Sequence, residues 1–594
     1  MKKEKSTTGN AFDFKLFKRL IDYTSGYKKT FYFVGFAAVM LSALGVLRPY
    51  LLKIAIDKGI VAQDLETTQF YILMMLAALI GEVLFQFSFI YFANWLGQQI
   101  IRDLRTQLFE HMLGFKKQYF DNSAVGRLVT RAVSDIETIA SIFSQGLFMI
   151  ISDMLKMIAV LIVMFYQSWQ LTLLILTVLP FIIYATRVFQ KKMKIAFEEV
   201  RSQVSNLNTF VQERITGMKI VQIFNCEKTE YQNFKAINEK HKKAWIKTVW
   251  YNAIFFPIAE MSTSITIGLI VWFGGLRVVE SDMLSLGIIV MFIELTQMLF
   301  RPLRQIADKF NSLQMGMVAA NRVFKIIDTE SRIPNEGTRL AEELKGHIEF
   351  KDVRFSYIED EEILKGINFN IKPGETIAIV GATGAGKSTI INLLSRYYDI
   401  DSGQILIDNH DVKNYELASL RNEIAVVLQD VFLFADSILK NITLSKPEID
   451  EKDVIQAAKD IGVHEFIMSL PNGYNYNVKE RGAMLSSGQR QLISFLRAYV
   501  TNPGILVLDE ATSSIDSYSE QLIQNATEKL TKGRTSIIIA HRLATIKNAD
   551  KIIVMEYGNI VEIGSHNELL KMDGYYQKLY EAQFENQDNT QDAE

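Results

Sequence analysis

The chain has 594 residues, too many for one compact domain and enough for two or three. Its net charge of −2 gives no indication of a nucleic-acid partner, and its single cysteine, Cys226, excludes both an internal disulfide framework and a multi-cysteine metal site. Apolar residues make up 49% of the chain, and nearly all the long uncharged runs lie in the first half. We therefore expect a membrane-embedded first half and a soluble second half.

The first 29 residues carry several basic side chains but no continuous apolar core of the kind found in a cleavable signal peptide. Their apolar residues recur instead at the spacing of an amphipathic helix, at Phe12, Leu16, Phe17, Leu20 and Ile21. We interpret residues 1–29 as a cytoplasmic amphipathic segment on the membrane surface.

Residues 30–327 are predicted to form a transmembrane domain with six spans, because each span needs about 20 predominantly apolar residues. Nearly uncharged runs occupy residues 30–47, 67–101, 157–186, 248–276 and 283–300. The run at 157–186 is too long for one span and too short for two. The third span is therefore expected to begin near Gly146 and to end at a turn at Gln167-Ser168. It then contains Asp153 and Lys156, which are three residues apart and able to face each other on one side of a helix.

The placement of Lys and Arg predicts the orientation of these spans. The short connections after the first, third and fifth spans contain only Lys58 and Arg277, whereas residues 102–137 and 187–247 contain six and thirteen basic residues. Both basic segments have a helical pattern, so we interpret them as long cytoplasmic extensions of the spans. A multi-pass protein with both termini in the cytoplasm is expected. The short apolar loops favour a bacterial cytoplasmic (inner) membrane.

Three acidic residues lie well inside the predicted spans, at Glu82, Glu260 and Glu294. An ionisable group is costly there and usually faces a cavity or a charged partner. Two interpretations stay open for each residue: it lines a path through the membrane, or it pairs with a neighbouring helix.

The second half has a different pattern. A polar, turn-rich linker at 328–345 leads into a domain at 346–580, and residues 581–594 form a polar tail. In this domain short β patterns alternate with helices; residues 348–357 alternate at a period of two, and residues 376–380 form a continuous buried-strand run. The predicted fold class is an all-α six-helix transmembrane domain followed by an α/β domain with a largely parallel core sheet.

A glycine-rich segment follows the strand at 376–380 and precedes a helix that begins at Ser388. It reads Gly381-x4-Gly386-Lys387-Ser388, the P-loop pattern, in the strand–loop–helix context that this pattern requires. Bare backbone lets N–H groups surround phosphate oxygens, and the helix dipole favours negative charge. Lys387 is expected to contact the β- and γ-phosphates of ATP, and Ser388 to bind Mg²⁺. The predicted nucleotide-binding residues of the loop are Gly381, Ala382, Thr383, Gly384, Ala385, Gly386, Lys387, Ser388 and Thr389.

A second apolar run, Ile505-Leu-Val-Leu, ends in two acids, Asp509 and Glu510. Asp509 is expected to hold Mg²⁺ through water, and Glu510 to polarise the attacking water as general base. Alone, such a strand is a weak signal. Together with the P-loop it indicates an ATP hydrolase that uses ATP and Mg²⁺.

Further motifs occur in the order found in ATP-binding cassette (ABC) proteins. Gln429 resembles the Q-loop glutamine, and Tyr357 resembles the aromatic residue that stacks on adenine. The other matches are the signature motif Leu485-Ser486-Ser487-Gly488-Gln489, the D-loop that ends at Asp516 and the H-switch at His541. Six helices before such a cassette make the chain similar to a type IV ABC exporter half-transporter, a resemblance that covers nearly the whole chain.

The resemblance implies a mechanism. Two cassettes would meet head to tail, with each ATP between one P-loop and the partner's signature loop. His541 would contact the γ-phosphate and Glu510, and Gln429 would bind the metal and link the nucleotide to the membrane half. The working unit would be a dimer with twelve spans. Residues 121–128 and 214–221 resemble the coupling helices that carry closure to the membrane, and ordinary solvated loop helices remain the alternative.

One position departs from the family pattern, which has Gly where this chain has Ser487. Heterodimeric exporters often combine an altered signature on one subunit with an altered glutamate on the other, and this chain keeps Glu510. A homodimer is favoured, and a heterodimer with a second half-transporter stays open.

The leading hypothesis is ATP-driven export of a lipophilic or amphipathic small molecule across the lipid bilayer, because aromatic spans with an acid such as Glu294 suit amphipathic cations. One alternative is a flippase for a lipid or lipid-linked precursor, with Arg48, Lys53 and Lys156 as contributors to a basic patch for an anionic head group. A remote alternative is an ATP-gated channel or regulatory membrane protein. The six spans exclude a soluble nucleic-acid-processing ATPase with the same cassette.

Overall fold

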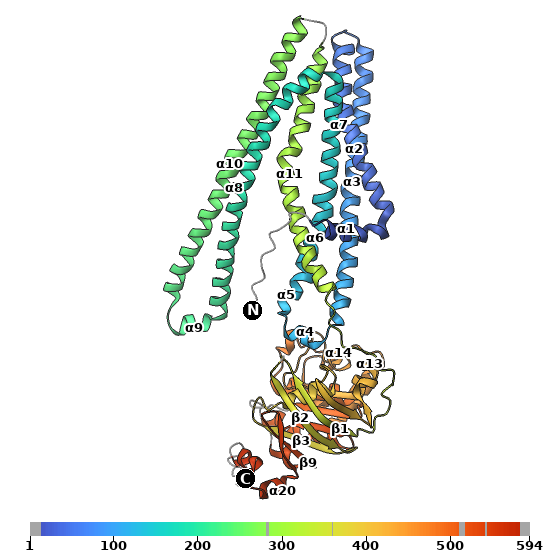
Figure 1. Ribbon diagram of the computed structural model, residues 1–594, viewed down its shortest axis with the longest axis vertical. Coiled ribbons are helices and arrows are strands. Elements are labelled where there is room, and N and C mark those ends of the chain that lie inside the picture. Colours follow the sequence, from blue (N-terminus) through green and yellow to red (C-terminus); the bar gives the residue numbers. More distant parts are fainter. Residues whose placement is uncertain (1–12, 281–283, 359, 510–516, 541–542, 582–594) are drawn as a thin grey trace. The chain divides into compact units, whose positions relative to one another are not determined.

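The computed structural model describes residues 13–280, 284–358, 360–509, 517–540 and 543–581 (Figure 1). The chain divides into two compact units: unit 1 is Met1–Leu113 with Ala124–Thr329, and unit 2 is Gly114–Ser123 with Glu330–Glu594. Unit 1 is helical, and unit 2 contains two β-sheets with flanking helices. The predicted fold class is confirmed.

Unit 1 is built from long helices. They are α1 (Phe14–Asp22), α2 (Lys28–Ile54), α3 (Leu65–Leu113), α5 (Val125–Thr130), α6 (Ile136–Ser141), α7 (Phe148–Gln167), α8 (Trp169–Thr216), α9 (Met218–Ile223), α10 (Glu227–Glu280) and α11 (Leu286–Ile327). Within the described ranges, six helical stretches are long and apolar enough to cross a membrane, which is the number predicted. The turn predicted between the third and fourth spans is also confirmed. Ser168 has extended backbone there, and its hydroxyl accepts from the N–H of Leu171 at the start of α8.

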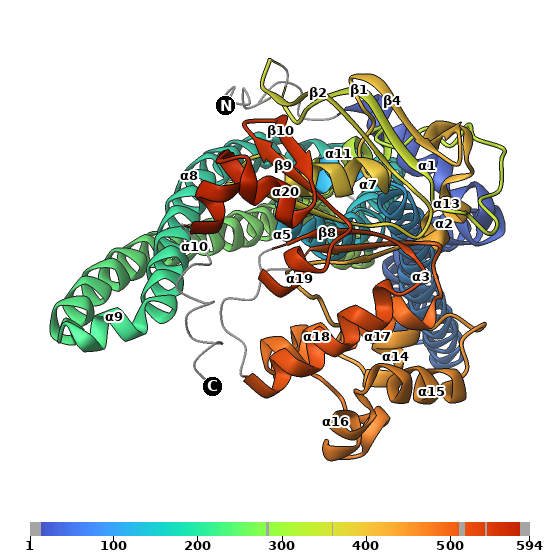
Figure 2. The same ribbon diagram turned by 90° about the horizontal axis from the view of Figure 1, so that it is seen from below.

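Four helices of unit 1 are much longer than a bilayer is thick. The helices α3, α8, α10 and α11 have 49, 48, 54 and 42 residues. At 1.5 Å per residue each extends roughly 60–80 Å, about twice the hydrocarbon core or more. Figures 1 and 2 show α8 and α10 side by side along their length and joined at one end by α9, so these two helices form an arm that diverges from α2, α3, α7 and α11.

Asp153 and Lys156 share α7, as expected, and the carboxylate of Asp153 also accepts a hydrogen bond from the amine of Lys309 on α11. One expectation for the helical half needs correction. The first expected coupling segment, residues 121–128, is not one helix. It spans the end of α4 (Lys117–Asp121) and the start of α5, because the backbone of Ala124 is extended and interrupts the helix between them. The second expected segment overlaps α9, which begins after Gly217 ends α8.

Unit 2 contains a four-stranded sheet in the order β2-β1-β4-β5 and a six-stranded sheet in the order β10-β9-β3-β8-β7-β6. The strands of the first sheet are β1 (Ile348–Ser356), β2 (Glu362–Ile371), β4 (Ser402–Ile407) and β5 (His410–Asp411); those of the second are β3 (Thr376–Gly381), β6 (Ile424–Val427), β7 (Ile505–Asp509), β8 (Thr535–Ile539), β9 (Lys551–Glu556) and β10 (Asn559–Gly564). From β9 to β6 every neighbouring pair is parallel, and only β10 is antiparallel. The expected largely parallel sheet is confirmed.

The six-stranded sheet is buried on both faces, which explains its continuous apolar runs. In β3, Ile377 and Ile379 belong to one apolar cluster, whereas Ala378 and Val380 belong to the other. Strand β7 alternates in the same way. The helices of unit 2, several of which are labelled in Figure 2, are α12 (Lys387–Leu394), α13 (Leu417–Glu423), α14 (Ile438–Thr443), α15 (Glu451–Ile461), α16 (His464–Ser469), α17 (Ser487–Val500), α18 (Ser517–Thr531), α19 (Leu543–Lys547) and α20 (His566–Lys571).

Candidate nucleotide-binding site

The P-loop connects β3 to α12 at the carboxyl edge of the parallel sheet. Two strands away along the sheet, β7 ends at Asp509 at the same edge. The hydroxyl of Ser388 donates to a carboxylate oxygen of Asp509 at 3.4 Å. The two metal ligands predicted from separate motifs are therefore neighbours in space.

Two glycines of the loop have no room for a side chain. Gly381 has φ +151°, and a Cβ added there would lie 2.2 Å from the carbonyl oxygen of Met555. Gly386 has φ +100°, and its Cβ would lie 2.8 Å from a methyl carbon of Leu364. Both are left-handed conformations that residues with a Cβ rarely adopt. The loop is consequently shaped by backbone, as a phosphate cradle requires.

Lys387 is only 8% exposed and begins α12. Its amine donates to the carbonyl oxygens of Gly381 and Ala382 at 2.7 and 3.0 Å, so it lies inside the loop. Burial lowers the pKa of Lys387, and the nearby charge of Asp509 opposes this shift only in part. A phosphate bound at the loop would stabilise this desolvated cation, which matches the role predicted for it.

The donor groups at this edge of the sheet suit Mg²⁺, which prefers oxygen ligands and keeps several of its waters. Ser388 offers a hydroxyl and Asp509 a carboxylate. Gln429, the third predicted metal ligand, is exposed and follows β6, the strand next to β7. Because carboxyl ends of parallel strands meet at one edge, all three lie on the same side of the sheet.

Tyr357 follows β1 directly and is fixed beside α12. Its hydroxyl donates to the hydroxyl of Thr389 at 3.3 Å and accepts from the amide of Asn392 at 3.1 Å. The aromatic ring predicted to stack on adenine is thus held next to the P-loop helix. Asn392 was not predicted from the sequence, although its spacing from Thr389 places both on one face of a helix that begins at the loop.

The signature segment forms a capped helix N-terminus. The hydroxyl of Ser486 accepts from the backbone N–H of Gln489 at 3.2 Å, and the Gln489 side chain accepts from the N–H of Ser486 at 3.0 Å. Leu485 is buried in the core, whereas Ser486 and Ser487 are exposed. Leu485 and Gln489 therefore hold the segment in place. The N–H groups from Ser487 and Gly488 onward start a helix whose dipole favours an anion.

Three residues predicted for this site lie outside the described residues: Glu510, Asp516 and His541. Their roles stay predictions.

The three acids of the membrane half have different surroundings. Glu82 on α3 lies 3.8 Å from the guanidinium of Arg48 on α2, which favours pairing with a neighbouring helix. Glu260 on α10 is exposed. Glu294 on α11 is half-buried and forms no ion pair with any other described residue. Lys53, expected in a basic patch, donates to Gln167 at 2.8 Å.

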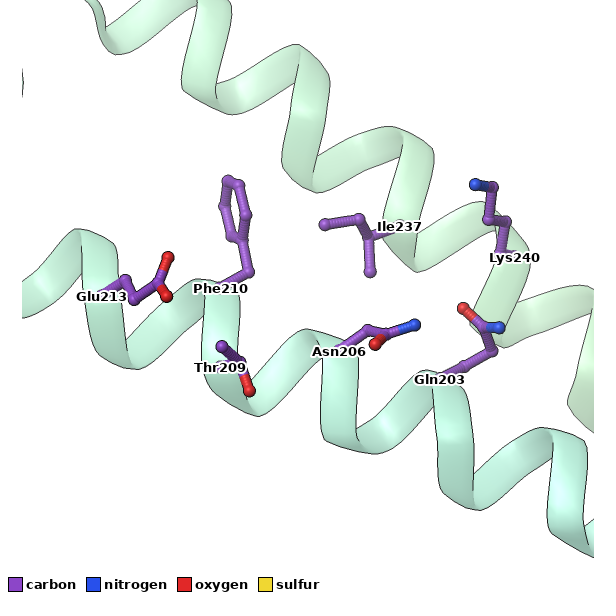
Figure 3. A pocket seen from close by; sticks show the side chains of 7 residues that line it. All are labelled: Gln203, Asn206, Thr209, Phe210, Glu213, Ile237 and Lys240. Carbon is purple, nitrogen blue, oxygen red and sulfur yellow. The ribbon is translucent and has the colours of Figure 1, made fainter. Parts of the chain in front are cut away.

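A separate pocket of about 430 Å³ lies between α8 and α10 in the extended arm (Figure 3). Phe210 and Ile237 project from the two helices into the space between them, and the side-chain oxygen of Gln203 is buried without a hydrogen-bond partner among the described residues. The lining residues are Gln203, Asn206, Thr209, Phe210, Glu213, Ile237 and Lys240. None of the residues predicted from the sequence lines this pocket.

Comparisons with known proteins identify relatives along nearly the whole chain. A family model for the ABC transporter transmembrane region matches residues 31–303, and a model described as ABC transporter matches residues 364–513. The chain is 35% identical to an uncharacterized ABC transporter ATP-binding protein of Bacillus subtilis (strain 168), over 95% of this chain and 94% of the relative. It is 35% identical to an ATP-dependent lipid A-core flippase of Syntrophus aciditrophicus, over 96% and 94%. It is 37% identical to a Staphylococcus aureus protein named for multidrug export as an ATP-binding/permease protein, over 96% and 100%.

Proposed function

Because the chain belongs to the ATP-binding cassette transporter family, we propose that it exports a lipophilic or amphipathic small molecule by alternating access, as one half of a dimer. The enzyme activity is ATP hydrolysis coupled to transport, as the fused transmembrane and ATP-binding regions indicate. The observation that carries the proposal is the P-loop, with Ser388 beside Asp509, in the same chain as six apolar spans.

In the proposed ATP site, Lys387 and the loop N–H groups bind the phosphates, and Tyr357 stacks on adenine. Ser388, Gln429 and Asp509 would hold Mg²⁺, which supplies charge neutralisation on the phosphate oxygens. Glu510 takes a proton from the attacking water, and His541 positions the γ-phosphate beside it. The N-terminus of α17, with the exposed Ser486 and the backbone of the buried Gly488, faces the ATP of a second copy.

A half-transporter of this family requires a second half, and we propose a second copy of this chain. Apolar side chains are exposed at the tip of the arm, with Ile223 60% and Phe224 68% exposed. Apolar side chains are also exposed beside Gln429, with Phe432 53% and Phe434 59% exposed. Such patches mark interaction sites on otherwise polar surfaces. We propose that α9 of one copy docks on the Phe432–Phe434 surface of the other.

The homodimer predicts a mass. When this chain is expressed alone and purified in detergent, the protein part of the complex should have twice the 67.8 kDa of one chain. Native mass spectrometry or light scattering measures this directly. A species of one chain's mass that becomes dimeric only with a different half-transporter would establish the heterodimer instead.

For the substrate, Glu294 offers a half-buried acid on α11 that suits an amphipathic cation. Glu294→Gln should slow uptake of a lipophilic cationic dye into inside-out vesicles by about tenfold, because losing roughly 1.4 kcal/mol of attraction changes an equilibrium by that factor. Glu294→Asp, which keeps the charge, is the matched control and should transport at close to the parent rate. Equal transport by the parent and Glu294→Gln would remove the acid from the substrate path.

A lipid flippase is the second candidate, favoured by a group of charges around Lys156 on α7. Lys156 interacts electrostatically with Arg48, Glu82, Asp153 and Arg301. With Lys309, the partner of Asp153, four basic side chains face two acidic ones, an excess that suits an anionic head group. The vesicle experiment separates the candidates: stimulation of ATP hydrolysis by a purified anionic lipid and not by the dye would favour the flippase.

We further propose an inner-membrane location with both termini in the cytoplasm. The support is the concentration of Lys and Arg in the long helical extensions and their near absence from the short connections.

A further inference from the structure

The segment Gly114–Ser123 belongs to unit 2, although its neighbours in the chain are the long helices of unit 1. Its short helix α4 is held by the start of the linker. The N–H of Lys116 donates to the carbonyl of Ser331 at 2.7 Å, and a Cβ added at Gly114 would lie 2.9 Å from the guanidinium of Arg332. Phe115 is 7% exposed. The segment is therefore packed against the nucleotide-binding unit.

Tyr398 provides a second attachment for α4. It lies shortly after α12 and is only 7% exposed, and its hydroxyl donates to the carboxylate of Asp121 at the end of α4. Lys117 of α4 lies 5.7 Å from the Tyr398 ring centre and 3.8 Å from the Asp121 carboxylate. Burial, followed by the bond to Asp121, raises the pKa of Tyr398, so its hydroxyl stays a proton donor at neutral pH.

Tyr398 also contacts Tyr357, the residue predicted to stack on adenine. The ring centres of Tyr398 and Tyr357 are 5.0 Å apart, and the rings meet edge to face at 86°. The hydroxyl of Tyr357 is in turn bound to Thr389 and Asn392 of the P-loop helix. A continuous series of contacts therefore runs from α12 through Tyr357 and Tyr398 to Asp121.

We propose that Tyr398 is a positioning residue that transmits binding of the nucleotide base at Tyr357 to α4. The inference rests on the proposed function, because Tyr357 is assigned there to the adenine of ATP. A base stacked on Tyr357 restricts that ring, and an edge-to-face neighbour must follow its orientation. Because Tyr398 is hydrogen-bonded to Asp121, restricting the Tyr398 ring also restricts the motion of α4. Nucleotide binding and the mobility of α4 are then coupled through one side chain.

A purely structural role for Tyr398 makes a different prediction. If Tyr398 only anchored α4, its loss would loosen α4 equally with and without nucleotide. If Tyr398 couples the two sites, its loss should abolish the response of α4 to nucleotide. The quantity that separates the two roles is therefore the change in the mobility of α4 when nucleotide is added.

The experiment uses the full-length protein in lipid nanodiscs with Mg²⁺ and the non-hydrolysable analogue AMP-PNP. Hydrogen–deuterium exchange of the amides at 114–123 is measured with and without the analogue, and AMP-PNP affinity is measured in parallel. The variants are Tyr398→Phe, which keeps the ring contact and removes the hydroxyl, Asp121→Ala, and the double variant. Tyr397→Phe is the matched control, since the Tyr397 ring packs on Arg421, with 5.0 Å between guanidinium carbon and ring centre.

In the parent and in Tyr397→Phe, AMP-PNP should slow exchange at 114–123 by about tenfold. In Tyr398→Phe and Asp121→Ala this slowing should shrink to within about twofold, with AMP-PNP affinity changed by no more than about twofold. The double variant should resemble either single one, because both remove the same bond.

Three results would overturn the inference. AMP-PNP could still slow exchange at 114–123 in Tyr398→Phe, it could fail to slow exchange in Tyr397→Phe as well, or it could fail to slow exchange in the parent. If Tyr398→Phe does not fold, Asp121→Ala carries the same comparison. Failure of the parent to bind AMP-PNP would overturn the proposed function instead. The affinity measurement detects this result independently of the exchange measurement.

Discussion

Replacing Glu510 by Gln is expected to lower the rate of ATP hydrolysis by about 100- to 1,000-fold, because general-base catalysis contributes roughly 10²- to 10⁴-fold and an amide cannot accept the proton. Glutamine has nearly the same shape as glutamate, and the change leaves Lys387 and the loop N–H groups, which we propose bind the phosphates, untouched. ATP affinity should therefore change by no more than about threefold. Phosphate release and ATP binding by the purified protein in nanodiscs measure the two effects separately.

The matched control for this change is Glu528→Gln. Glu528 is exposed on α18, so its loss should leave hydrolysis at the parent rate. Hydrolysis by Glu510→Gln that is as fast as in the parent would show that another group activates the water, and the proposed catalytic mechanism would be wrong.

Replacing Lys387 by Ala should act on binding rather than on the chemical step alone. The amine lies inside the loop, bonded to the carbonyls of Gly381 and Ala382, where it is placed to contact phosphate oxygens. Charge-assisted hydrogen bonds are worth about 1.5–3 kcal/mol each, so losing two of them to ATP should weaken ATP binding by at least about 100-fold. Titration of the purified protein with a fluorescent ATP analogue measures this.

Lys413→Ala is the control for the loss of a positive charge, because Lys413 is exposed in a turn away from the loop. It should bind ATP as the parent does. Thermal unfolding of both variants checks that they are folded. This check is needed because Lys387 is buried and its removal takes away the donor that bonds to the carbonyls of Gly381 and Ala382. Unchanged ATP affinity in a folded Lys387→Ala protein would contradict the phosphate-binding role.

Features that are encoded entirely by neighbouring residues could be predicted from the sequence. A helix crosses a bilayer if about 20 consecutive residues are apolar, so the six spans follow from composition along the chain. The P-loop is equally local: its glycines, its lysine and its place between a buried strand and a helix lie within a few residues. The cap at Ser486 and Gln489 likewise joins residues three apart.

Contacts with partners elsewhere in the chain could not be predicted. The sequence places Asp153 on one helix with Lys156, and only the structure shows the bond that Asp153 accepts from Lys309, 156 residues away. In the same way, only the structure shows that Lys53 donates to Gln167. Helical spacing shows which side chains share a face, but it does not show which other helix that face meets.

By itself, the sequence determined the six spans, the parallel α/β domain and the phosphate loop, because periodicity, apolar length and backbone freedom are encoded in neighbouring residues. Only the tertiary structure decided that Ser388 meets Asp509, 121 residues away, and that Tyr398 meets Asp121, 277 residues away. The first contact depends on the strand order β3-β8-β7. The second depends on α4 packing with the nucleotide-binding unit rather than with its neighbours in the chain. Strand order and packing are set by how buried faces fit together over the whole fold, and no single stretch of residues contains that information.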